Sequence, residues 1–390
     1  MKLLFPFFYT LLLLLLWVVA LPFLLFLMRK PKYRQSLPAR FWLWRNRALA
    51  PSDIYIHLCS YGEAIAIKPL IEAWKSRRIA LSAITKTGRE VIAKYTSNSA
   101  YLPFELWLPF WMRKHRMLIL IEAELWYLLV LLAKRKGTHT ILLNARITDR
   151  SFGRYWKMRW FYREIFAHID AVFCQTSLDQ ERLEALGARN VRVIGNIKLA
   201  TKIVSTRVLP KPAREMIVAA STHEGEEELI LASYRPTPKS VLVVVPRHPE
   251  RFDAVDTLLR VYTMARGLHY HRYSQEPHFE SDVVLVDTMG ELINIYAISD
   301  VVILGGAFAS IGGHNPLEPA HFGNKIISGE HIFNLKSLFA LVENVAIVSP
   351  EMLEETLAQR ATLLPAHIQG EVDLTPFYHY IESELSHGQY

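Results

Sequence analysis

The sequence predicts two doubly wound α/β domains that follow one apolar N-terminal segment. From residue 54 onward, short apolar runs of β-type residues alternate with polar turns and helix-like segments, which is typical of βαβ units and parallel sheets. The length of 390 residues exceeds what one ordinary hydrophobic core fills, so two domains are expected. Residues 199–215 interrupt the alternation and contain Pro210 and Pro212, which indicates a linker. We therefore expect two domains that face each other across a cleft.

Eleven apolar runs are predicted to be strands, six before the linker and five after it. They are residues 54–59, 79–85, 117–121, 140–143, 171–174 and 191–194, and then 217–220, 241–245, 283–286, 301–304 and 325–327. Polar residues and glycines follow the carboxyl ends of most of these runs. Open parallel sheets bind ligands at that edge, so the functional residues are expected there in both domains.

The N-terminal segment has the composition of a membrane anchor. Residues 3–28 are apolar except for the hydroxyls of Tyr9 and Thr10, and the segment is long enough to cross the hydrocarbon core of a bilayer. A signal peptide usually has a shorter apolar region and a small-residue cleavage site, and neither is clear here. We expect a single anchor over residues 1–30, and Pro6 and Pro22 leave open whether it spans the bilayer or lies partly in the interface.

Basic residues follow the anchor immediately. They are Arg29, Lys30, Lys32, Arg34 and Arg40, and the positive-inside tendency places the rest of the chain in the cytoplasm. The net charge of +8 suits an anionic membrane surface, a phosphorylated substrate or nucleic acid. Because no nucleic-acid-binding module is recognisable, we expect the anionic inner leaflet as a partner and no nucleic acid.

The most informative stretch is 301–320. A run typical of a buried strand precedes four glycines within nine residues, and a helix start follows, with Asn315 as its expected N-cap and Pro316 at its first position. Unpaired N–H groups of the glycine loop and the helix start are expected to bind an anion. Glu318, in the first turn, could accept hydrogen bonds from sugar hydroxyls. The alternative is an ordinary strand–turn–helix in which the glycines serve packing.

Taken together, the polar clusters resemble those of the bacterial 3-deoxy-D-manno-octulosonic acid (Kdo) transferases of lipid A assembly. The matching stretches are 60–63, 87–88, 122–126, 144–146, 150–151, 195–198, 221–227, 245–252, 287–292 and 312–319. The resemblance implies the GT-B glycosyltransferase fold, with two Rossmann-like domains facing across a cleft. It also implies an enzyme of lipopolysaccharide biosynthesis at the cell inner membrane, with its catalytic domains on the cytoplasmic side. The implied reaction moves Kdo from CMP-Kdo to a sugar hydroxyl of a tetraacylated lipid A precursor (lipid IVA), with inversion.

The resemblance also implies catalytic roles for three residues. Glu63 matches the general base of the family, and Glu122 and Lys198 match residues that stabilise the transition state. Each has an ordinary alternative: the two glutamates could be carboxylates at helix starts, favoured by the helix dipole, and Lys198 could be a solvated lysine.

The donor is expected in the second domain. The family's CMP-binding segments match Pro246, Arg247, Met289, Gly290, Glu291, Asn315, Pro316, Leu317 and Glu318, and Ser221 and Thr222 could add hydroxyl donors. Arginine can bind a phosphate through two parallel hydrogen bonds, which lysine cannot. The sequence has no Asp-X-Asp pair of the kind that holds a metal under a diphosphate, and a CMP-sugar has one phosphate. We therefore expect no metal and no cofactor besides the donor substrate CMP-Kdo.

The expected domains are an anchor (1–30), an acceptor-binding domain (31–205) and a CMP-sugar-binding domain (206–390), whose last helix packs back on the first. Residues 101–117 carry an apolar patch with a basic rim, which suits a phosphorylated lipid at a membrane; a solvated basic helix face is the alternative. The aromatic members are Phe104, Trp107, Phe110 and Trp111, and the basic ones are Arg113, Lys114, His115 and Arg116.

Two other functions are compatible with the residue pattern. Spacing alone does not exclude a GT-B transferase that uses a UDP-sugar, because only the resemblance selects CMP. A membrane-tethered nucleotide-binding module without activity is the second alternative. The presence of Glu63, Lys198, Arg247 and Glu318 argues against it.

Overall fold

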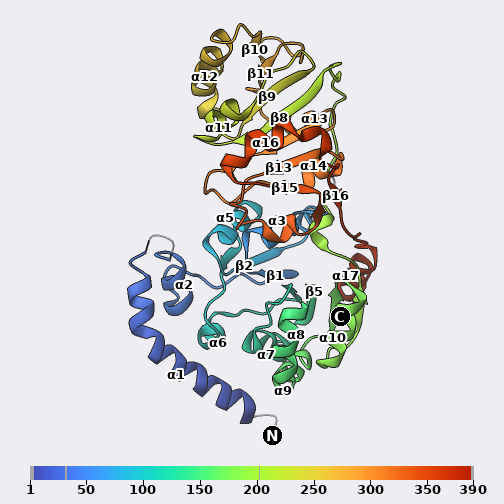
Figure 1. Cartoon of the computed structure of the whole chain (residues 1–390). Helices are drawn as coiled ribbons and strands as arrows, with labels where there is room; N and C mark the ends of the chain where they lie inside the picture. The colour runs from blue at the N-terminus through green and yellow to red at the C-terminus, as the bar shows by residue number, and fades with distance from the viewer. Residues whose placement is uncertain (1–3, 31–32, 202, 388–390) are drawn as a thin grey trace. The chain divides into compact units, whose positions relative to one another are not determined.

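The computed structural model describes residues 4–30, 33–201 and 203–387 (Figure 1). The chain divides into two compact units. The N-terminal unit comprises residues 1–201 and 371–390, and the C-terminal unit comprises residues 202–370. Lys32 and residues 1–3 of the expected anchor lie outside the described residues.

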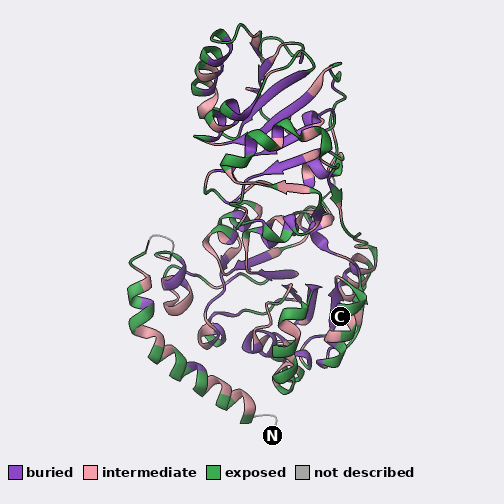
Figure 2. Ribbon diagram, viewed as in Figure 1, coloured by how far each residue is buried: buried purple, intermediate pink, exposed green. Residues whose placement is uncertain are grey.

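The N-terminal unit is built on a parallel seven-stranded sheet with the order β3-β2-β1-β4-β5-β6-β7. Its strands are β1 (Ile54–Leu58), β2 (Ile79–Ala83), β3 (Ser99–Tyr101), β4 (Met117–Ile121), β5 (His139–Ala145), β6 (Ala171–Cys174) and β7 (Val191–Val193). Every residue of β1 and β4 is buried, and Figure 2 shows this for β1 by colour. Helices cover both faces of such a sheet, which is why these strands read as continuous apolar runs in the sequence.

The helices of this unit follow the strands in alternation. They are α2 (Ser36–Trp42), α3 (Tyr61–Ala66), α4 (Lys68–Ala73), α5 (Lys86–Tyr95), α6 (Leu108–Trp111), α7 (Tyr127–Arg135), α8 (Asp149–Lys157), α9 (Arg159–Phe166) and α10 (Ser177–Ala185), with short 3-10 turns η1 (Glu105–Trp107) and η2 (Ile197–Leu199). They form two apolar clusters. The first includes residues of α7 and α9, and the second includes residues of α3 and α4.

The last helix of the chain, α17 (Thr375–His387), returns to the N-terminal unit. Phe377, Ile381 and Leu385 recur every four residues and are buried in the second apolar cluster. A close backbone approach precedes this helix, because Gly195 pairs with Val372. Gly195 has φ +83°, and a Cβ at this position would lie 1.8 Å from the carbonyl oxygen of Glu371, so only glycine fits.

The C-terminal unit contains a second parallel seven-stranded sheet, with the order β10-β11-β9-β8-β12-β13-β15. Its strands are β8 (Glu215–Thr222), β9 (Ser240–Pro246), β10 (Tyr270–Arg272), β11 (Val283–Leu285), β12 (Val301–Leu304), β13 (Lys325–Ser328) and β15 (Val345–Ile347). A small antiparallel pair, β14 (Val342–Glu343) and β16 (His367–Ile368), accompanies it. The helices are α11 (Glu226–Ser233), α12 (Phe252–Met264), α13 (Leu292–Tyr296), α14 (Leu317–His321), α15 (Lys336–Phe339) and α16 (Leu353–Ala358), with turns η3 (Pro249–Arg251), η4 (Pro350–Met352) and η5 (Arg360–Thr362).

These two sheets confirm the predicted α/β class with two Rossmann-like units. All eleven predicted strands are present, and three strands of the large sheets were not predicted. The missed strands are β3, β10 and β15, each three residues long and each at the edge of its sheet. An edge strand is paired on one side only, so it needs neither a long apolar run nor burial on both faces, and its sequence signal is weak.

The N-terminal segment forms one continuous helix, α1 (Leu4–Leu27), which is long and apolar enough to cross a membrane. One side of it packs along the N-terminal unit, and the packed residues Phe5, Tyr9, Leu13 and Trp17 recur every four residues. The Tyr9 hydroxyl donates to Oε2 of buried Glu105 at 2.6 Å. The opposite side of α1 is exposed and apolar, as the alternating colours along this helix in Figure 2 show.

Candidate active site

Glu63 lies in the first turn of helix α3, which follows strand β1. Its carboxylate folds back over the helix start: Oε2 accepts from the backbone N–H of Cys59 at 2.8 Å, and Oε1 accepts from the Ser60 hydroxyl at 2.7 Å. Ser60 Oγ in turn accepts from the backbone N–H of Glu63 at 3.3 Å. Ser60 and Glu63 therefore form a capping box, and the sequence Ser60-Tyr61-Gly62-Glu63 carries its signature.

The Glu63 carboxyl is also electrostatically poised for proton transfer. The side chain is buried, with the residue only 7% exposed. Burial, and then the neighbouring Glu122, raise the pKa of Glu63 to about 7, although the hydrogen bonds from Cys59 and Ser60 act in the opposite direction. A carboxyl group with a pKa near neutrality can accept a proton at physiological pH, so the capping role and a role as general base are compatible.

Glu122 and Lys198 form an ion pair in the same unit. Lys198 Nζ lies 2.6 Å from Glu122 Oε1, and the lysine side chain is almost fully buried. Glu122 follows β4 with φ 58°, while Lys198 lies in η2 after β7. Asn144 at the end of β5 joins them: its Nδ2 donates to Glu122 Oε1 at 3.3 Å, and its Oδ1 accepts from the backbone N–H of Ile197 at 3.1 Å. A buried lysine with one carboxylate partner is not an ordinary solvated lysine.

The structure therefore brings Glu63, Glu122 and Lys198 together. They come from positions far apart in the sequence, and each follows the carboxyl end of a strand of one sheet. The influence of Glu122 on the pKa of Glu63 reflects their proximity. Two carboxyl groups and one ammonium group in a largely buried space can exchange protons and stabilise either sign of developing charge.

One further residue close to this edge, His57, does not belong to the strand-end clusters. His57, in the middle of β1, is fully buried; its Nδ1 bonds the Ser82 hydroxyl at 2.8 Å, and its Nε2 lies 3.5 Å from Glu124 Oε2. Trp126 Nε1 donates to the same Glu124 oxygen at 2.8 Å. Although burial disfavours the charged form, His57 and Trp126 hold the pKa of Glu124 below its ordinary value. A histidine inside an apolar strand was the available signal in the sequence.

In the C-terminal unit, the glycine loop after β12 does not offer the free amides that we expected. The carboxylate of Glu226 accepts from the backbone N–H groups of Gly306, Phe308 and Ala309 at 2.7–3.0 Å. The N–H groups of Gly312 and Gly313 donate to the carbonyl of Gly306. The expected anion-binding loop is thus occupied by an internal carboxylate, and that prediction is wrong for these amides.

The helix after this loop supplies carboxylate and amide groups instead. Helix α14 begins at Leu317, one residue later than expected, and Asn315 Oδ1 accepts from the backbone N–H of Leu317 at 3.1 Å. Asn315 Nδ2 donates to Glu318 Oε1 at 3.1 Å. Burial raises the pKa of Glu318, while Asn315 and Arg247 oppose the shift, so the exposed Arg247 at the end of β9 lies near this carboxyl. Asn315, Glu318 and Arg247 form one polar cluster, and Pro316 is the N-cap residue of α14.

Two histidines lie beside the cluster. His223 and His314 stack with their ring planes 8° apart, and their Nε2 atoms are 2.9 Å apart, which makes one a donor and the other an acceptor. Burial and then Arg247 lower the pKa of His314 to about 3, so it stays neutral. A Cβ on Gly306 would meet the His314 ring at 2.9 Å, which explains this glycine.

The remaining residues predicted to bind the donor substrate differ in exposure and in how far their polar groups are already hydrogen-bonded. Met289 is exposed, Gly290 has φ 88°, and Glu291 is bound by Arg207 at 2.7 Å and by Asn294. The Thr222 hydroxyl donates to Glu227 at 2.6 Å. The hydroxyl of Thr288, which precedes Met289 in the sequence, is buried and has no partner among the described residues. Pro246 ends β9, and Ser221 is nearly buried with φ 55°.

Comparison with known proteins identifies the family. The family model described as "3-Deoxy-D-manno-octulosonic-acid transferase (kdotransferase)" matches residues 35–201. The 3-deoxy-D-manno-octulosonic acid transferase of Haemophilus influenzae is 35% identical over 369 residues, which cover 87% of this chain and 85% of that protein. The chain belongs to the Kdo transferase family. It is therefore a glycosyltransferase, as the resemblance predicted.

Other Kdo transferases and one solved structure are also similar. The 3-deoxy-D-manno-octulosonic acid transferase of Bordetella pertussis is 32% identical over 348 residues, which cover 80% of each protein. The crystal structure of the C-terminal CMP-Kdo binding domain of WaaA from Acinetobacter baumannii is 28% identical, covers 45% of this chain and 89% of that one, and aligns with a TM-score of 0.34.

The apolar patch expected on this Kdo transferase at residues 101–117 is largely covered. Trp111 is buried, Trp107 packs against Trp17 of α1, and only Phe110, 77% exposed, projects freely. His115 is buried and bonds Ser52, so it does not belong to a basic rim. Helix α1 covers part of these aromatic residues, so the expectation of an exposed apolar patch with His115 in its rim is wrong.

One group of possible metal ligands lies within the described residues. His271, Glu276 and His278 place ligand atoms within 4.8 Å of one another. Both ring nitrogens of His271 are already hydrogen-bonded, Nδ1 to the Ser281 hydroxyl and Nε2 to the carbonyl of His278. The group lies at β10, an edge strand of the sheet, two strands from β9, which carries Arg247. We do not associate it with the donor residues.

Proposed function

We propose that this Kdo transferase moves Kdo from CMP-Kdo to a sugar hydroxyl of a tetraacylated lipid A precursor, with inversion at the anomeric carbon. The acceptor oxygen forms a bond to that carbon while the bond to the CMP phosphate oxygen breaks. The acceptor hydroxyl loses its proton to Glu63, and CMP leaves with the bonding electron pair. One base and one stabilised leaving phosphate are the minimum that such a displacement needs.

The observation that carries the proposal is the convergence of Glu63, Glu122 and Lys198. Glu63 has a pKa of about 7 because it is buried beside Glu122, which suits a base that must be deprotonated before each turnover and protonated after it. Lys198, 2.6 Å from Glu122, can stabilise negative charge, and Glu122 can stabilise the oxocarbenium-like centre. If Glu63 served only to cap helix α3, the buried ammonium group of Lys198 at the same edge of the sheet would have no explanation.

The C-terminal unit is proposed to bind the donor. Arg247 can hold the single phosphate, and the cluster of Asn315 and Glu318 can hydrogen-bond hydroxyl or amino groups of the nucleoside. Pro246, Met289, Gly290, Glu291, Pro316 and Leu317, and less directly Ser221 and Thr222, are proposed to shape the site. The mechanism requires no metal, because one phosphate can be neutralised by a guanidinium group.

The N-terminal unit is proposed to bind the acceptor at the cytoplasmic face of the inner membrane. The outer face of α1 exposes thirteen large apolar side chains, far more than a water-exposed surface usually carries. Since its inner side packs on the unit, α1 lies along the domain, and we propose that it is embedded in the membrane interface. Deleting residues 1–28 should loosen membrane attachment in a flotation assay and also uncover the rings of Tyr127 and Trp107.

The decisive experiment is turnover of CMP-Kdo with purified lipid IVA, with the product mass recorded. A mass increase by one or more Kdo residues is expected from the full chain. Glu63→Gln should reduce turnover by ~10²–10⁴-fold. Glu72→Gln is the matched control, because Glu72 is an exposed glutamate on α4 paired with Lys68. Equal turnover of the two variants would disprove the role of Glu63.

The nucleotide is tested separately by thermal stability. CMP should raise the melting temperature and UDP should not, since ligand binding to the folded state stabilises it. A larger shift with UDP, together with turnover of a UDP-sugar, would favour the other transferase hypothesis. Binding of CMP without any product would favour a nucleotide-binding module.

A further inference from the structure

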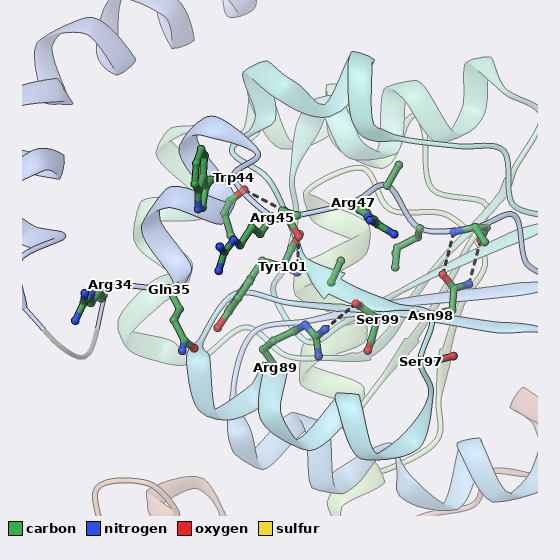
Figure 3. A pocket seen from close by; sticks show the side chains of 16 residues that line it. Arg34, Gln35, Trp44, Arg45, Arg47, Arg89, Ser97, Asn98, Ser99 and Tyr101 are labelled. Atoms are coloured by element: carbon green, nitrogen blue, oxygen red, sulfur yellow. Dashed lines mark hydrogen bonds between the residues drawn. The ribbon is translucent and has the colours of Figure 1, made fainter.

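A large basic pocket lies in the N-terminal unit, outside the group of Glu63, Glu122 and Lys198. Its volume is about 1150 Å³, and Figure 3 shows the side chains that line it. The wall is made by the residues before and after α2, by Arg89 of α5, and by edge strand β3. The segment 44–50 closes one side. The volume is in the range of pockets that bury small-molecule ligands.

The lining is positively charged without compensation. It includes Arg34, Arg45, Arg47 and Arg89 and no aspartate or glutamate. Within the part of the chain that the structure describes, none of these four guanidinium groups forms an ion pair with a carboxylate, whereas Arg78 nearby pairs with Asp53 at 3.0 Å. Arg89 donates to the carbonyl of Ser99, and burial lowers its pKa. Four unpaired guanidinium groups around one space favour a multiply charged anion.

Hydrogen bonds fix the backbone of the pocket wall, which carries the arginines. Buried Asn46 donates to the carbonyls of Ala39 and Tyr101 at 3.1 and 2.9 Å and accepts from the backbone N–H of Tyr101 at 3.2 Å. Asn98 bonds both the N–H and the carbonyl of Ala50, as the dashed lines in Figure 3 show. Arg45 itself has φ 51°, a conformation that side-chain-bearing residues rarely adopt.

The position of the pocket points to a membrane ligand. Helix α1 ends at Leu27, and the seven residues from there to Arg34 can span at most about 25 Å. Trp44, 65% exposed on the pocket wall, is the type of residue that anchors proteins at the headgroup level. Arginine binds phosphate oxygens bidentately, and Gln35, Ser97 and Tyr101 add neutral donors.

We propose that this pocket binds the phosphate-bearing headgroup of a membrane lipid. The pocket borders β3, whereas Glu63 follows β1, two strands away, so the two sites are separated by about 10 Å or more at the usual strand spacing. Two sources share this chemistry: an anionic glycerophospholipid of the bilayer, or a phosphate of the glycolipid acceptor itself. Only the second source depends on the proposed function.

The test uses the full-length triple variant Arg34→Gln, Arg45→Gln and Arg47→Gln. The control variant is Lys75→Gln, Lys94→Gln and Arg189→Gln, which loses the same charge at exposed positions without ion pairs among the described residues. Arg89 is left unchanged because it supports the wall. The melting temperatures of both variants establish that they fold. A second pocket variant, Arg34→Lys, Arg45→Lys and Arg47→Lys, keeps the charge without the bidentate geometry.

Two measurements distinguish the sources. Binding to phosphatidylglycerol-containing vesicles, against pure phosphatidylcholine vesicles, should fall by roughly tenfold or more in the glutamine variant if a bilayer phospholipid occupies the pocket. The Michaelis constant for the lipid acceptor, but not for CMP-Kdo, should rise by a similar factor if the acceptor phosphate occupies it. Either result supports the proposal, and the lysine variant should recover only part of the loss. If pocket and control variants behave alike in both measurements, the proposal is overturned. The vesicle measurement needs no turnover, so it stands even if the enzyme proves inactive with lipid IVA.

Discussion

Replacing Glu63 by glutamine should reduce turnover by ~10²–10⁴-fold and, above neutral pH, stabilise the N-terminal unit. The folded protein raises the pKa of this carboxyl from 4.5 to about 7, first by burial and then through Glu122. A charged carboxylate is therefore less stable in its folded environment than in the unfolded chain. Glutamine has nearly the same shape and no charge, so the variant escapes this penalty.

The magnitude follows from the shift. A difference of two to three pKa units corresponds to about 3 kcal/mol. For an acid with a raised pKa, the stabilisation by the neutral form is complete below pH 4.5 and is lost as pH rises to about 7. The variant sacrifices part of the hydrogen bonding to Ser60 and Cys59, which is worth about 1 kcal/mol per bond. We therefore expect a net gain of about 1–3 kcal/mol near pH 8 and a small loss near pH 5.

The assay compares melting temperatures of wild type, Glu63→Gln and Glu72→Gln in detergent at both pH values. One kcal/mol corresponds to roughly 2–4 °C for a unit of this size, so several degrees of stabilisation should appear near pH 8 only. The exposed Glu72 should show no such dependence. A difference between wild type and Glu63→Gln that is the same at both pH values would refute the raised pKa, and with it the electrostatic argument for the base.

Three further predictions concern other residues. Glu122→Gln removes the negative charge that, after burial, raises the pKa of Glu63, so the acidic limb of the pH profile of kcat/KM should move to lower pH. An unmoved limb would mean that the two carboxyl groups do not interact in the working enzyme. Arg247→Ala and Glu318→Ala should each weaken CMP binding by roughly 10- to 100-fold in calorimetry, with exposed Arg266→Ala as control, because a charge-assisted hydrogen bond contributes about 1.5–3 kcal/mol. Unchanged affinity in both would place the donor elsewhere. Gly195→Ala should lower the melting temperature far more than Gly267→Ala. Both glycines have a positive φ, but of the two only Gly195 has a backbone atom within 4 Å of an added Cβ. Similar losses in the two variants would argue against close packing of Gly195 on Glu371.

The strands were predictable because buried parallel strands must be apolar along their whole length. Ten of the eleven predicted runs lie inside the two sheets and satisfied this condition, whereas the eleventh, β7, is a partly exposed edge strand. The missed strands β3, β10 and β15 are edge strands too, and an edge strand need not be apolar along its whole length. The capping box of Ser60 and Glu63 was equally readable, since its spacing is local.

Features that depend on distant residues could not be read from the sequence. The glycine loop of residues 305–313 looked like an empty anion site, but the carboxylate that occupies it comes from Glu226, about eighty residues earlier in the chain. The aromatic residues near position 107 looked like a lipid-binding surface, yet their cover is the N-terminal helix, through Trp17. In both cases the sequence pattern correctly indicated that these groups bind a partner. The partner is another segment of the same chain, not a ligand.

The return of α17 to the N-terminal unit reverses the usual order of assembly. Domains generally fold from the N-terminus during synthesis, each as its sequence is completed. Here the C-terminal unit, residues 202–370, is complete before the N-terminal unit receives its final segment. Until Phe377, Ile381 and Leu385 are made, Trp74 and Phe173 of the nascent N-terminal unit lack the apolar side chains against which their cluster packs.

On the ribosome, the C-terminal unit is therefore complete while the N-terminal unit still lacks its last helix. A fragment that ends at residue 201 should aggregate or bind chaperones, whereas residues 202–370 form a continuous segment that contains its whole core. Residues 371–390 belong to the N-terminal unit, so premature termination before them should yield a protein that retains the C-terminal unit but lacks a finished N-terminal unit.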